Sequence, residues 1–384
     1  MVLKSRQWIT GTLSLILLIQ GCGSANSSLP QPDRPSRNLV AEELDRPLQK
    51  VLDNTIIEQD IPGMVLFVST PEQVWQGAAG VTNLETPTPM QPSDRFRIAS
   101  ISKMFVATVT LQLVEEDKLS LEDTLTDRLP EDIADGLPNT DEITIRQLLQ
   151  HTSGLADYID NNDFDRRVEN TSPTHVWTAR EAIAYAYDLE PEFDPDEDFY
   201  YSNTNYLALE LIIEEIAGTT LAEVLRSRIH SPLGLNDTFT EGREILPGEF
   251  VVGYEDWDGD GEPDNMNQYN EGYGLGDGGL ISTARDLAMF ARVLLADEEL
   301  LDPNTFDEML DWVEDGDGNL YGLGVSAWDS EWGEVWGHDG RSGGFLSTLW
   351  YLPEEEAIVV VWANDGDNAD PNEIAEAALR LILD

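Results

Sequence analysis

Strand-like segments lie at both ends of this 384-residue chain, and helix-like segments fill the stretch between them. Near the beginning, residues 63–70 and 73–81 have the composition of two strands joined by a Pro-Glu turn. Hairpin-like neighbours at both ends favour antiparallel pairing. We therefore expect an α/β (α+β) fold, with a mainly antiparallel sheet built from both chain ends, flanking helices and a large, mostly helical insertion. The strands expected near the end are 321–328, 334–337, 345–352 and 357–363.

From residue 100 onward the apolar residues follow the period of a helix. They recur every four positions from Ile101 to Leu113, which predicts a helix of about four turns. An amphipathic segment at 44–56 predicts an earlier helix, with Pro47 in its first turn. Further helices are expected at 143–150, 178–188, 204–217, 220–228, 284–296 and 371–383.

The first residues have the features of an export signal. Lys4 and Arg6 precede an apolar stretch at 9–19 that is too short to span a bilayer comfortably. The stretch runs into Ile19-Gln20-Gly21-Cys22, which resembles a bacterial lipobox, so we expect export and anchoring to the cell membrane through lipidated Cys22. An ordinary secretory signal is the alternative. The expected organisation is a lipoprotein signal peptide at 1–21, a flexible tether at 22–40 and a folded domain at 41–384, with an α/β lobe at about 41–100 and 320–384 and a helical lobe at about 101–319.

The charge balance limits the classes of partner. There are 74 acidic residues against 22 Lys and Arg, for a net charge of -52. We therefore expect no nucleic-acid partner, because phosphate binding needs basic patches. The acidity suits a high-salt environment, in which screening weakens self-repulsion, and simple solubility is the alternative. With Cys22 as the only cysteine, neither a disulfide framework nor a cysteine metal site can form.

The tetrapeptide Ser100-Ile101-Ser102-Lys103 combines a nucleophile with a candidate base. Ser100 lies where a strand-like segment meets the predicted helix, so the positive end of the helix dipole would favour negative charge developing at its Oγ. Lys103 is three residues further on, and the two side chains share a helix face. Burial disfavours an ammonium, so Lys103 can act as the base or as a cation that steers another base. A chance Ser–Lys pair is the alternative for this motif alone.

The triplet Tyr201-Ser202-Asn203 follows an acidic run and precedes the helix predicted at 204–217. A lysine cation stabilises a neighbouring phenolate, so Tyr201 is a candidate to take the proton of Ser100. Asn203 offers an amide donor to a substrate carbonyl, and its own carbonyl oxygen can accept from Lys103. A core tyrosine followed by a helix-capping asparagine is the alternative.

A third motif, His338-Asp339-Gly340, marks a strand that ends in a glycine-rich edge. Gly340 lets the backbone approach a ligand closely. The backbone N–H of Arg341 would then form an oxyanion hole together with that of Ser100. His338 is expected to orient or polarise the far side of the site, with a packed structural role as the alternative. Together the three motifs supply the parts for acyl transfer through a covalent serine intermediate.

Ser342 offers a rival nucleophile, because it lies in a Gly-x-Ser-x-Gly sequence. A nucleophile elbow of that type needs a helix after the serine and a histidine later in the chain. Residues 345–352 read as a strand instead, and no histidine follows His338. We therefore reject Ser342 as the nucleophile.

The acidic segment 256–264 matches part of an EF-hand-type calcium loop. Its candidate ligands are Asp256, Asp258, Asp260 and Asp264. Position 12 of the loop is Asn267 instead of glutamate, so we favour an acidic turn within a hairpin. Residues 315–319 form a similar turn, and we expect no metal or other cofactor.

With the three motifs in this order, the chain resembles the serine β-lactamase/penicillin-binding protein superfamily. Within it, the chain looks closest to the branch of class C β-lactamases, D-Ala-D-Ala carboxypeptidases and family VIII esterases. The resemblance covers about residues 41–384. Residues 149–155 resemble the His-Thr-Ser-Gly signature of this branch, and residues 278–287 resemble its Gly-Gly-Leu-x-Ser-Thr segment. We expect both segments to be scaffold.

The resemblance implies that Ser100 is acylated, that Lys103 activates it and that Tyr201 relays protons. It also implies that Asn203 contacts Lys103 and the substrate amide. His338 stands where the commoner motif has a lysine, a replacement found in the peptidase and esterase branches, and this points away from efficient β-lactam hydrolysis. The glutamate segment that class A enzymes use for deacylation is absent from the sequence.

We therefore expect a lipid-anchored serine hydrolase that works through an acyl-enzyme on Ser100 and is D-alanyl-D-alanine carboxypeptidase-like or esterase-like. A β-lactamase of modest turnover and a non-turnover penicillin- or peptidoglycan-binding module are the alternatives. The expected substrate is a small molecule, peptide or ester, including a peptidoglycan stem peptide, and Arg341 would read a substrate carboxylate. We expect a monomer that touches the membrane only through its lipid anchor.

Overall fold

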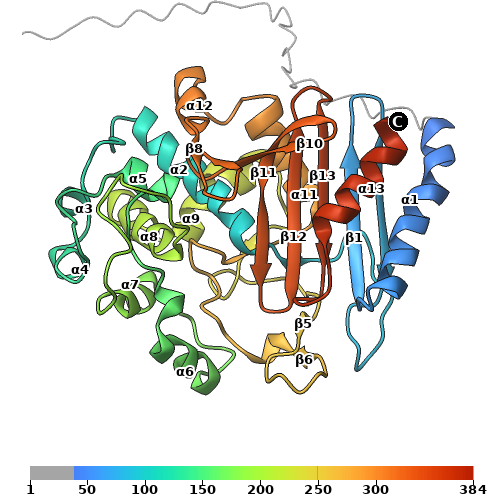
Figure 1. The fold of residues 1–384 in the computed structure, drawn as a ribbon, viewed down its shortest axis with the longest axis horizontal. Helices are drawn as coiled ribbons and strands as arrows, with labels where there is room; N and C mark the ends of the chain where they lie inside the picture. Colours follow the sequence, from blue (N-terminus) through green and yellow to red (C-terminus); the bar gives the residue numbers. More distant parts are fainter. Residues whose placement is uncertain (1–38, 249, 384) are drawn as a thin grey trace, which may run out of the picture. The chain divides into compact units, whose positions relative to one another are not determined.

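The computed structural model describes residues 39–248 and 250–383, and its largest sheet joins the two ends of this range (Figure 1). Within the described residues this sheet has eight strands, in the order β2-β1-β13-β12-β11-β10-β9-β8. β1 pairs with β13, Met64 lying opposite Ala363, and all pairings in the sheet are antiparallel. This confirms the predicted sheet. Its strands are β1 (Gly63–Ser69), β2 (Val74–Gly80), β8 (Val313–Glu314), β9 (Leu320–Tyr321), β10 (Ser326–Ser330), β11 (Gly333–Ser342), β12 (Phe345–Leu352) and β13 (Ala357–Ala363).

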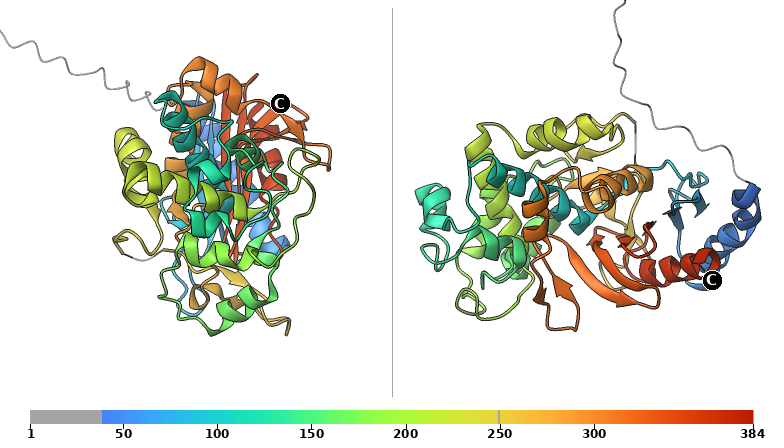
Figure 2. Two further views of the ribbon diagram at one scale, coloured as in Figure 1. Left: turned by 90° about the vertical axis from the view of Figure 1, so that its left-hand side faces the viewer. Right: turned by 90° about the horizontal axis from the view of Figure 1, so that it is seen from above.

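Both faces of the sheet are buried, because alternate side chains enter two different core layers. In β13, Ile358, Val360 and Trp362 belong to one layer, whereas Val359 and Val361 belong to the other. The helices α1 (Leu39–Glu58) and α13 (Pro371–Leu383) pack in the second layer, and α11 (Ala284–Ala291) packs in the first, against β1, β12 and β13 (Figures 1 and 2). Double-sided burial explains why β13 is an unbroken apolar run.

The helical part of the domain surrounds two long buried helices. These are α2 (Ser102–Glu115), whose side chains are buried around most of its circumference, and α8 (Asn203–Ala217), which packs against it. A helix buried on all sides needs neighbours on all sides. The other helices and turns are η1 (Ala99–Ile101), α3 (Leu125–Arg128), α4 (Glu131–Ala134), α5 (Ile145–Gln150), η2 (Tyr158–Asp160), α6 (Asn162–Asn170), α7 (Ala179–Ile183), η3 (Ala184–Ala186), α9 (Leu221–Leu225), η4 (Arg226–His230), α10 (Ser231–Leu233), η5 (Met266–Gln268), η6 (Arg292–Ala296) and α12 (Pro303–Met309).

A small sheet of β3 (Phe96–Arg97), β7 (Leu280–Ser282) and β4 (Phe239–Thr240) lies under the start of α2. Its strand β3 is the strand-like segment expected before Ser100, whereas β7 and β4 were not predicted. Likewise, α11 falls within the range assigned to the helical lobe but packs on the main sheet. The two lobes are therefore more interleaved than the sequence predicted.

Several element boundaries differ from the predicted ones. The strand expected at 321–328 is broken into β9 and β10, because Gly324 between them has a φ of 83°, which residues with a Cβ rarely adopt. β11 continues to Ser342, five residues beyond the predicted end at 337. Pro47 lies inside α1 and not in its first turn, because the helix already begins at Leu39.

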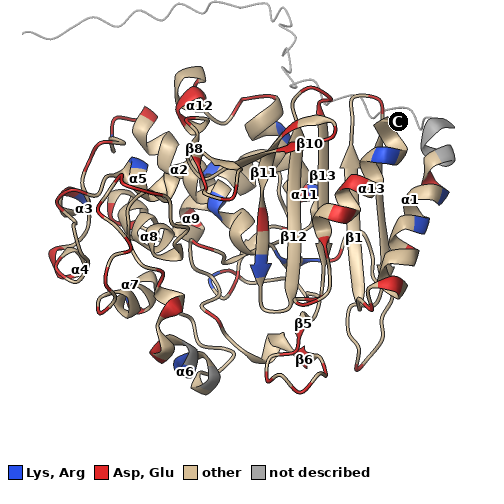
Figure 3. Ribbon diagram, viewed as in Figure 1, with Lys and Arg blue, Asp and Glu red and all other residues tan. Residues whose placement is uncertain are grey.

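The predicted signal peptide, Cys22 and the tether as far as residue 38 lie outside the described residues. Among the residues from 39 onward that the structure describes, no helix combines the length and the apolar character needed to cross a bilayer. Figure 3 shows acidic residues on helices and loops throughout the domain, with few basic ones between them.

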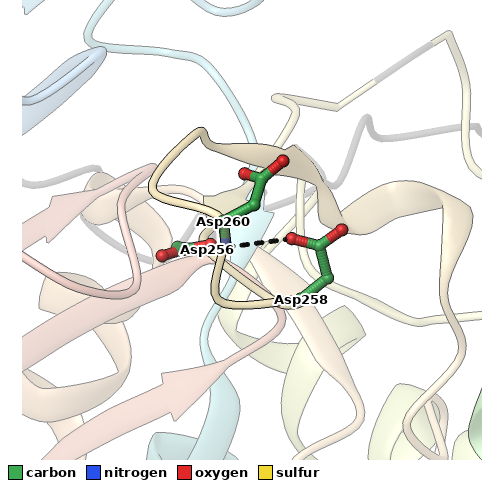
Figure 4. A group of neighbouring side chains, drawn as sticks. All are labelled: Asp256, Asp258 and Asp260. Carbon is green, nitrogen blue, oxygen red and sulfur yellow. Dashed lines mark hydrogen bonds between the residues drawn. The ribbon is translucent and has the colours of Figure 1, made fainter.

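The acidic segment 256–263 joins the two strands of a hairpin, β5 (Tyr254–Glu255) and β6 (Asp264–Asn265). Carboxylate oxygens of Asp256, Asp258 and Asp260 lie within 4.8 Å of one another (Figure 4). Asp258 accepts a hydrogen bond from the backbone N–H of Asp260 over 3.1 Å, the pattern of an Asx turn. The segment therefore forms the turn of a hairpin, as predicted. Residues 315–319 likewise join β8 to β9.

Candidate active site

Ser100 lies in the short turn η1, which leads from β3 into α2. The preceding residue, Ala99, has a φ of 49°, a left-handed conformation that costs roughly 1–2 kcal/mol for a residue with a Cβ. The turn is tied to β7 on both sides: Ile98 N–H donates to Leu280 O over 3.0 Å, and Leu280 N–H donates to Ser102 Oγ over 3.2 Å. A strained turn held in this way keeps Ser100 at the start of α2.

The side chain of Lys103 is buried, and its Nζ has three neighbours. Nζ lies 3.1 Å from Ser100 Oγ, 2.7 Å from Asn203 Oδ1 and 2.6 Å from the backbone oxygen of Asp277. The two carbonyl oxygens can only accept, so they use two N–H bonds of Lys103. The remaining position of Nζ faces Ser100; it is an N–H donor in the ammonium and a lone pair in the neutral amine. In its neutral form Lys103 can take the proton of Ser100 directly.

Asp157 holds Asn203 through two hydrogen bonds, a contact that the sequence did not predict. Asn203 Nδ2 and the backbone N–H of Asn203 both donate to Asp157 Oδ2, over 2.8 and 3.1 Å. These two bonds turn Asn203 Oδ1 toward Lys103. Burial raises the pKa of the Asp157 carboxyl to about 6. The sequence offered one sign of this role: Asp157 comes two residues after the 149–155 segment, a segment that was expected to be scaffold.

Asp277 is a second missed residue, placed just before the 278–287 segment. Its backbone oxygen accepts from Lys103, and its carboxylate accepts from the hydroxyl of Tyr158 over 2.9 Å. Burial raises the pKa of the Asp277 carboxyl. Both segments expected to be scaffold therefore lie next to residues that contact the site.

Tyr201 lies in the loop before α8, and its ring is close to both Lys103 and His151. Lys103 Nζ is 4.9 Å from the ring centroid, and the His151 ring stacks on Tyr201 with centroids 4.2 Å apart. The Tyr201 hydroxyl is buried and has no hydrogen-bond partner among the described residues. His151 Nδ1 accepts from Ser202 N–H over 3.1 Å and faces Asn205 Nδ2 at 3.0 Å. His151, from the supposed scaffold segment, therefore positions the loop that carries Tyr201.

His338 lies on β11 with its ring centroid 6.2 Å from that of Tyr201. Its Nδ1 is 2.6 Å from the backbone oxygen of Asp339, and its Nε2 is 3.0 Å from the hydroxyl of Tyr321. Burial lowers the pKa of His338 to about 3, and the positive charge of Lys103 adds to this effect. A carbonyl can only accept, so Nδ1 of the neutral ring carries the proton and Nε2 accepts from Tyr321. His338 thus brings no positive charge to the site.

The part of β11 that follows Gly337 has a free edge. β10 pairs with β11 only as far as Gly337, so from His338 to Ser342 the edge away from β12 has no strand partner among the described residues. A Cβ at Gly340 would lie 2.5 Å from the backbone oxygen of Ile98. Gly340 therefore lets the backbone of β11 pack closely against the turn that precedes Ser100. The sequence had instead predicted a close approach of this backbone to a ligand.

The side chain of Arg341 is 65% exposed, and its Nη2 lies 3.2 Å from Glu255 Oε1. Its positive charge therefore faces a carboxylate of the protein itself. The neighbouring Ser342 ends β11 and is followed by a two-glycine turn and β12, so no helix follows it. The absence of a helix after Ser342 agrees with the prediction that Ser342 does not lie in a nucleophile elbow.

Ser100 lines two cavities, which also share Asn203 and Arg341 as lining residues. The smaller, of about 330 Å³, extends toward η2, α6 and residues 271–278. The larger, of about 860 Å³, is lined by Tyr201, His338 and residues near the start of α13. Ser100 can thus be reached from both cavities. Each cavity can hold the part of a substrate that lies on one side of the reacting carbonyl.

Comparison with known proteins gives a consistent result. The model of the beta-lactamase family matches residues 38–384. The chain is 26% identical over 356 residues to penicillin-binding protein 4* of Bacillus subtilis (strain 168), covering 88% of this chain and 75% of that protein. It is 28% identical over 330 residues to a D-aminopeptidase of Brucella anthropi, covering 84% of this chain and 59% of that protein. The structure of a D-stereospecific amidohydrolase from Streptomyces sp. matches with a TM-score of 0.78 and 29% identity, over 87% of this chain and 98% of that one. The chain belongs to the beta-lactamase family and is a serine hydrolase.

Proposed function

We propose that the protein cleaves esters, amides or peptides through an acyl-enzyme formed on Ser100. The observation that carries this proposal is the position of Lys103 Nζ, 3.1 Å from Ser100 Oγ, with its other two hydrogen bonds held by carbonyl oxygens. A buried amine constrained in this way has one position left, and that position faces the nucleophile. This is the arrangement that activates a serine hydroxyl.

The steps follow from this arrangement. Ser100 Oγ attacks the substrate carbonyl while its proton passes to Lys103 Nζ, with Tyr201 as the second candidate carrier. The backbone N–H groups of Ser100 and Arg341 stabilise the oxyanion. Collapse of the intermediate expels an alcohol or amine, which takes up the proton and leaves Ser100 acylated. Water then adds to the acyl carbonyl and gives up a proton to the same base. The bond between the acyl group and Ser100 Oγ breaks, the base returns the proton to Oγ, and the acid is released.

The finer choice lies between a D-Ala-D-Ala carboxypeptidase-like and an esterase-like or amidase-like activity. A carboxypeptidase must bind a terminal carboxylate, whereas His338 is neutral and Arg341 already faces Glu255. These two observations favour esters and amides without a free carboxylate. The names of two relatives, a D-aminopeptidase and a D-stereospecific amidohydrolase, point to amide substrates in those proteins. A slow β-lactamase or a non-turnover penicillin-binding module is the alternative function.

A substrate panel tests the proposal. Nitrocefin, p-nitrophenyl esters, D-Ala-D-Ala peptides and D-amino acid amides would be offered to the wild type and to Ser100→Ala. Ser342→Ala is a matched control, because it removes the rival serine from the same site. We expect Ser100→Ala to abolish both turnover and labelling by a fluorophosphonate in intact-mass spectra, and Ser342→Ala to be labelled normally. Labelling that survives in Ser100→Ala would overturn the mechanism, and acylation of Ser100 without turnover on any substrate would favour the binding module.

We also propose that the protein is exported and anchored through Cys22. The support is the sequence alone, with Lys4 and Arg6 ahead of an apolar stretch at 9–19 that runs into Ile19-Gln20-Gly21-Cys22. Metabolic labelling with radioactive palmitate would test it, with Cys22→Ser as the control. A protein that incorporates no label, or that remains in the membrane fraction after Cys22→Ser, would contradict the anchor.

A further inference from the structure

The smaller cavity beside Ser100 combines apolar and acidic lining residues. Its apolar side chains include Phe164, Val168 and Trp257. Among the charged lining residues that the structure describes, three are acidic and one is basic: Glu255, Glu271 and Asp277 against Arg341. Such a cavity favours a ligand with an apolar part and a positive charge, because a carboxylate there would face an excess of negative charge.

The three carboxylates differ in how far their hydrogen-bonding capacity is used. Glu255 faces Arg341 at 3.2 Å and also accepts from Gly344 N–H over 3.2 Å. Asp277 accepts from Tyr158. Glu271 accepts one bond, from Gly343 N–H to Oε2 over 2.9 Å, and its Oε1 has no hydrogen-bond or ion-pair partner among the described residues.

No ion pair joins Glu271 to a base among the described residues, although the charges of Arg97 and Arg341 act on it. Arg97 is a buried base whose charge acts on Glu271, but its Nε and one terminal nitrogen each bind the Glu241 carboxylate over 2.9 Å. Burial raises the pKa of the Glu271 carboxyl, Arg97 opposes this effect, and the negative charge of Glu255 adds to it. A cation bound beside Glu271 would favour the ionised form of this carboxyl.

A second unpaired polar group lies at the same place. Tyr273 lines the cavity, is 8% exposed, and its hydroxyl has no hydrogen-bond partner among the described residues. This hydroxyl oxygen would lie 2.3 Å from a Cβ built on Gly343, the residue whose N–H binds Glu271. Two oxygen atoms with unused capacity therefore converge on the turn that follows Ser342. The Tyr273 hydroxyl is a buried polar group without a partner; such a group calls for an explanation, and a ligand is one.

We propose that Glu271 and Tyr273 receive a primary ammonium group of the substrate, so that the preferred substrates are amides, esters or peptides with a free amine and an apolar side chain. This inference rests on the acyl-enzyme function proposed above. An ammonium has three N–H donors, of which Glu271 Oε1 accepts one in a charge-assisted bond and the Tyr273 oxygen accepts another. The apolar lining residues of the cavity would pack against the apolar side chain of the substrate.

Matched substrates test the ammonium site. Phenylalanine amide, in both enantiomers, would be compared with its N-acetyl derivative and with 3-phenylpropionamide, which lacks the amine. We expect kcat/KM for the free amine to exceed that for the acetylated form by about tenfold to a hundredfold, the range of a charge-assisted hydrogen bond. 6-Aminohexanamide separates a side-chain amine from an α-amine. Equal rates on amines and their acetylated forms would overturn the proposal.

Variants of Glu271 and Tyr273 test whether these two residues cause the preference for amine substrates. Glu271→Gln should remove the preference for the amine by raising KM for amine substrates and leave 3-phenylpropionamide unchanged. Glu262→Gln, on the exposed 256–263 turn, is the control for the loss of one negative charge. Tyr273→Phe removes only the hydroxyl and should weaken the preference in the same direction, which keeps the test valid if Glu271→Gln does not fold. An equal loss on all substrates would show a structural role and refute the proposal.

Binding to Ser100→Ala separates this inference from the proposed function. Calorimetry would compare phenylalanine amide with 3-phenylpropionamide on that variant, with and without Glu271→Gln. Tighter binding of the amine that disappears with Glu271→Gln would support the ammonium site even if no substrate is turned over. Acylation of Ser100 without any amine preference, in rate or in binding, would refute the ammonium site and leave the acyl-enzyme intact.

Discussion

Asn203 donates a hydrogen bond from Nδ2 to the buried carboxylate of Asp157 over 2.8 Å, and this contact sets the orientation of its amide. The opposite end of the same amide, Oδ1, lies 2.7 Å from Lys103 Nζ. A reversed amide would place an NH₂ group against the amine of Lys103 and displace it from Ser100. Asp157 therefore acts on the nucleophile through two intervening side chains.

This relationship predicts different results for two replacements of Asp157. Asp157→Ala leaves Asn203 Nδ2 without an acceptor, and we expect kcat to fall by about tenfold to a hundredfold, as for other small displacements of catalytic groups. Asp157→Asn keeps an acceptor oxygen and should recover most of the activity. Steady-state kinetics would measure both, with Asp188→Asn at an exposed site as the control. Equal losses in the two variants would show that the charge of Asp157, and not its acceptor oxygen, is what matters.

The buried side chain of Glu210 predicts a loss of stability as the pH rises. It accepts from Gly276 N–H over 2.6 Å, and burial, reinforced by the negative charge of Glu214, raises its pKa to about 8. The folded state therefore holds this proton more tightly than the unfolded state, where the ordinary value is about 4.5. The contribution to stability is fully present below pH 4.5 and is lost as the pH rises to about 8, by an amount on the order of a few kcal/mol.

Urea unfolding at pH 5 and pH 8 would measure this loss. We expect Glu210→Gln to flatten the dependence of the free energy of unfolding on pH, because the glutamine cannot ionise. Glu215→Gln, at an exposed position of the same helix, should leave the wild-type slope unchanged. A Glu210→Gln variant with the wild-type slope would show that Glu210 does not titrate in this range.

His338 is predicted to remain neutral throughout the pH range in which the enzyme would be assayed. Burial lowers its pKa to about 3, so the folded ring stays uncharged while the unfolded ring takes up a proton below pH 6.5. Stability should therefore fall as the pH drops from 6.5 toward 3, by about 1.4 kcal/mol per pH unit for each such histidine. Nitrogen-15 NMR of the imidazoles between pH 5 and pH 8 should show His338 fixed in its Nδ1–H form. A titration of this ring near pH 6.5 would contradict the assignment.

Two replacements of His151 would separate its contacts. His151→Phe keeps a ring that can stack on Tyr201 but leaves Ser202 N–H without an acceptor, which should cost about 1–3 kcal/mol of unfolding free energy. His151→Asn keeps an acceptor and suits the left-handed backbone there, where φ is 60°, but removes the stacked ring. We expect the asparagine variant to lose kcat and the phenylalanine variant mainly to lose melting temperature. The reverse pattern would mean that the hydrogen bonds, and not the ring, position Tyr201.

Much of the sheet was predictable from the sequence because its strands are long and strongly patterned. The runs that became β1, β12 and β13 are apolar on both faces or bounded by turn residues, and their ends were predicted to within a few positions. The break between β9 and β10 was not predictable, since it depends on the positive φ of Gly324 and not on composition. Nor was the packing of α11 on the sheet, because an apolar helix face does not specify which surface covers it.

The sequence by itself determined that Ser100 and Lys103 share one face at the start of a helix, because a spacing of three residues is a local property of the helix. It also placed Tyr201, Asn203 and His338 in motifs of a recognisable order. Only the tertiary structure decided which other groups complete the site. Asp157 meets Asn203 across 46 positions and Lys103 meets Asp277 across 174, distances in the chain over which no local pattern acts. It also decided the electrostatics, because burial keeps His338 neutral and the chain's turns set Glu255 against Arg341.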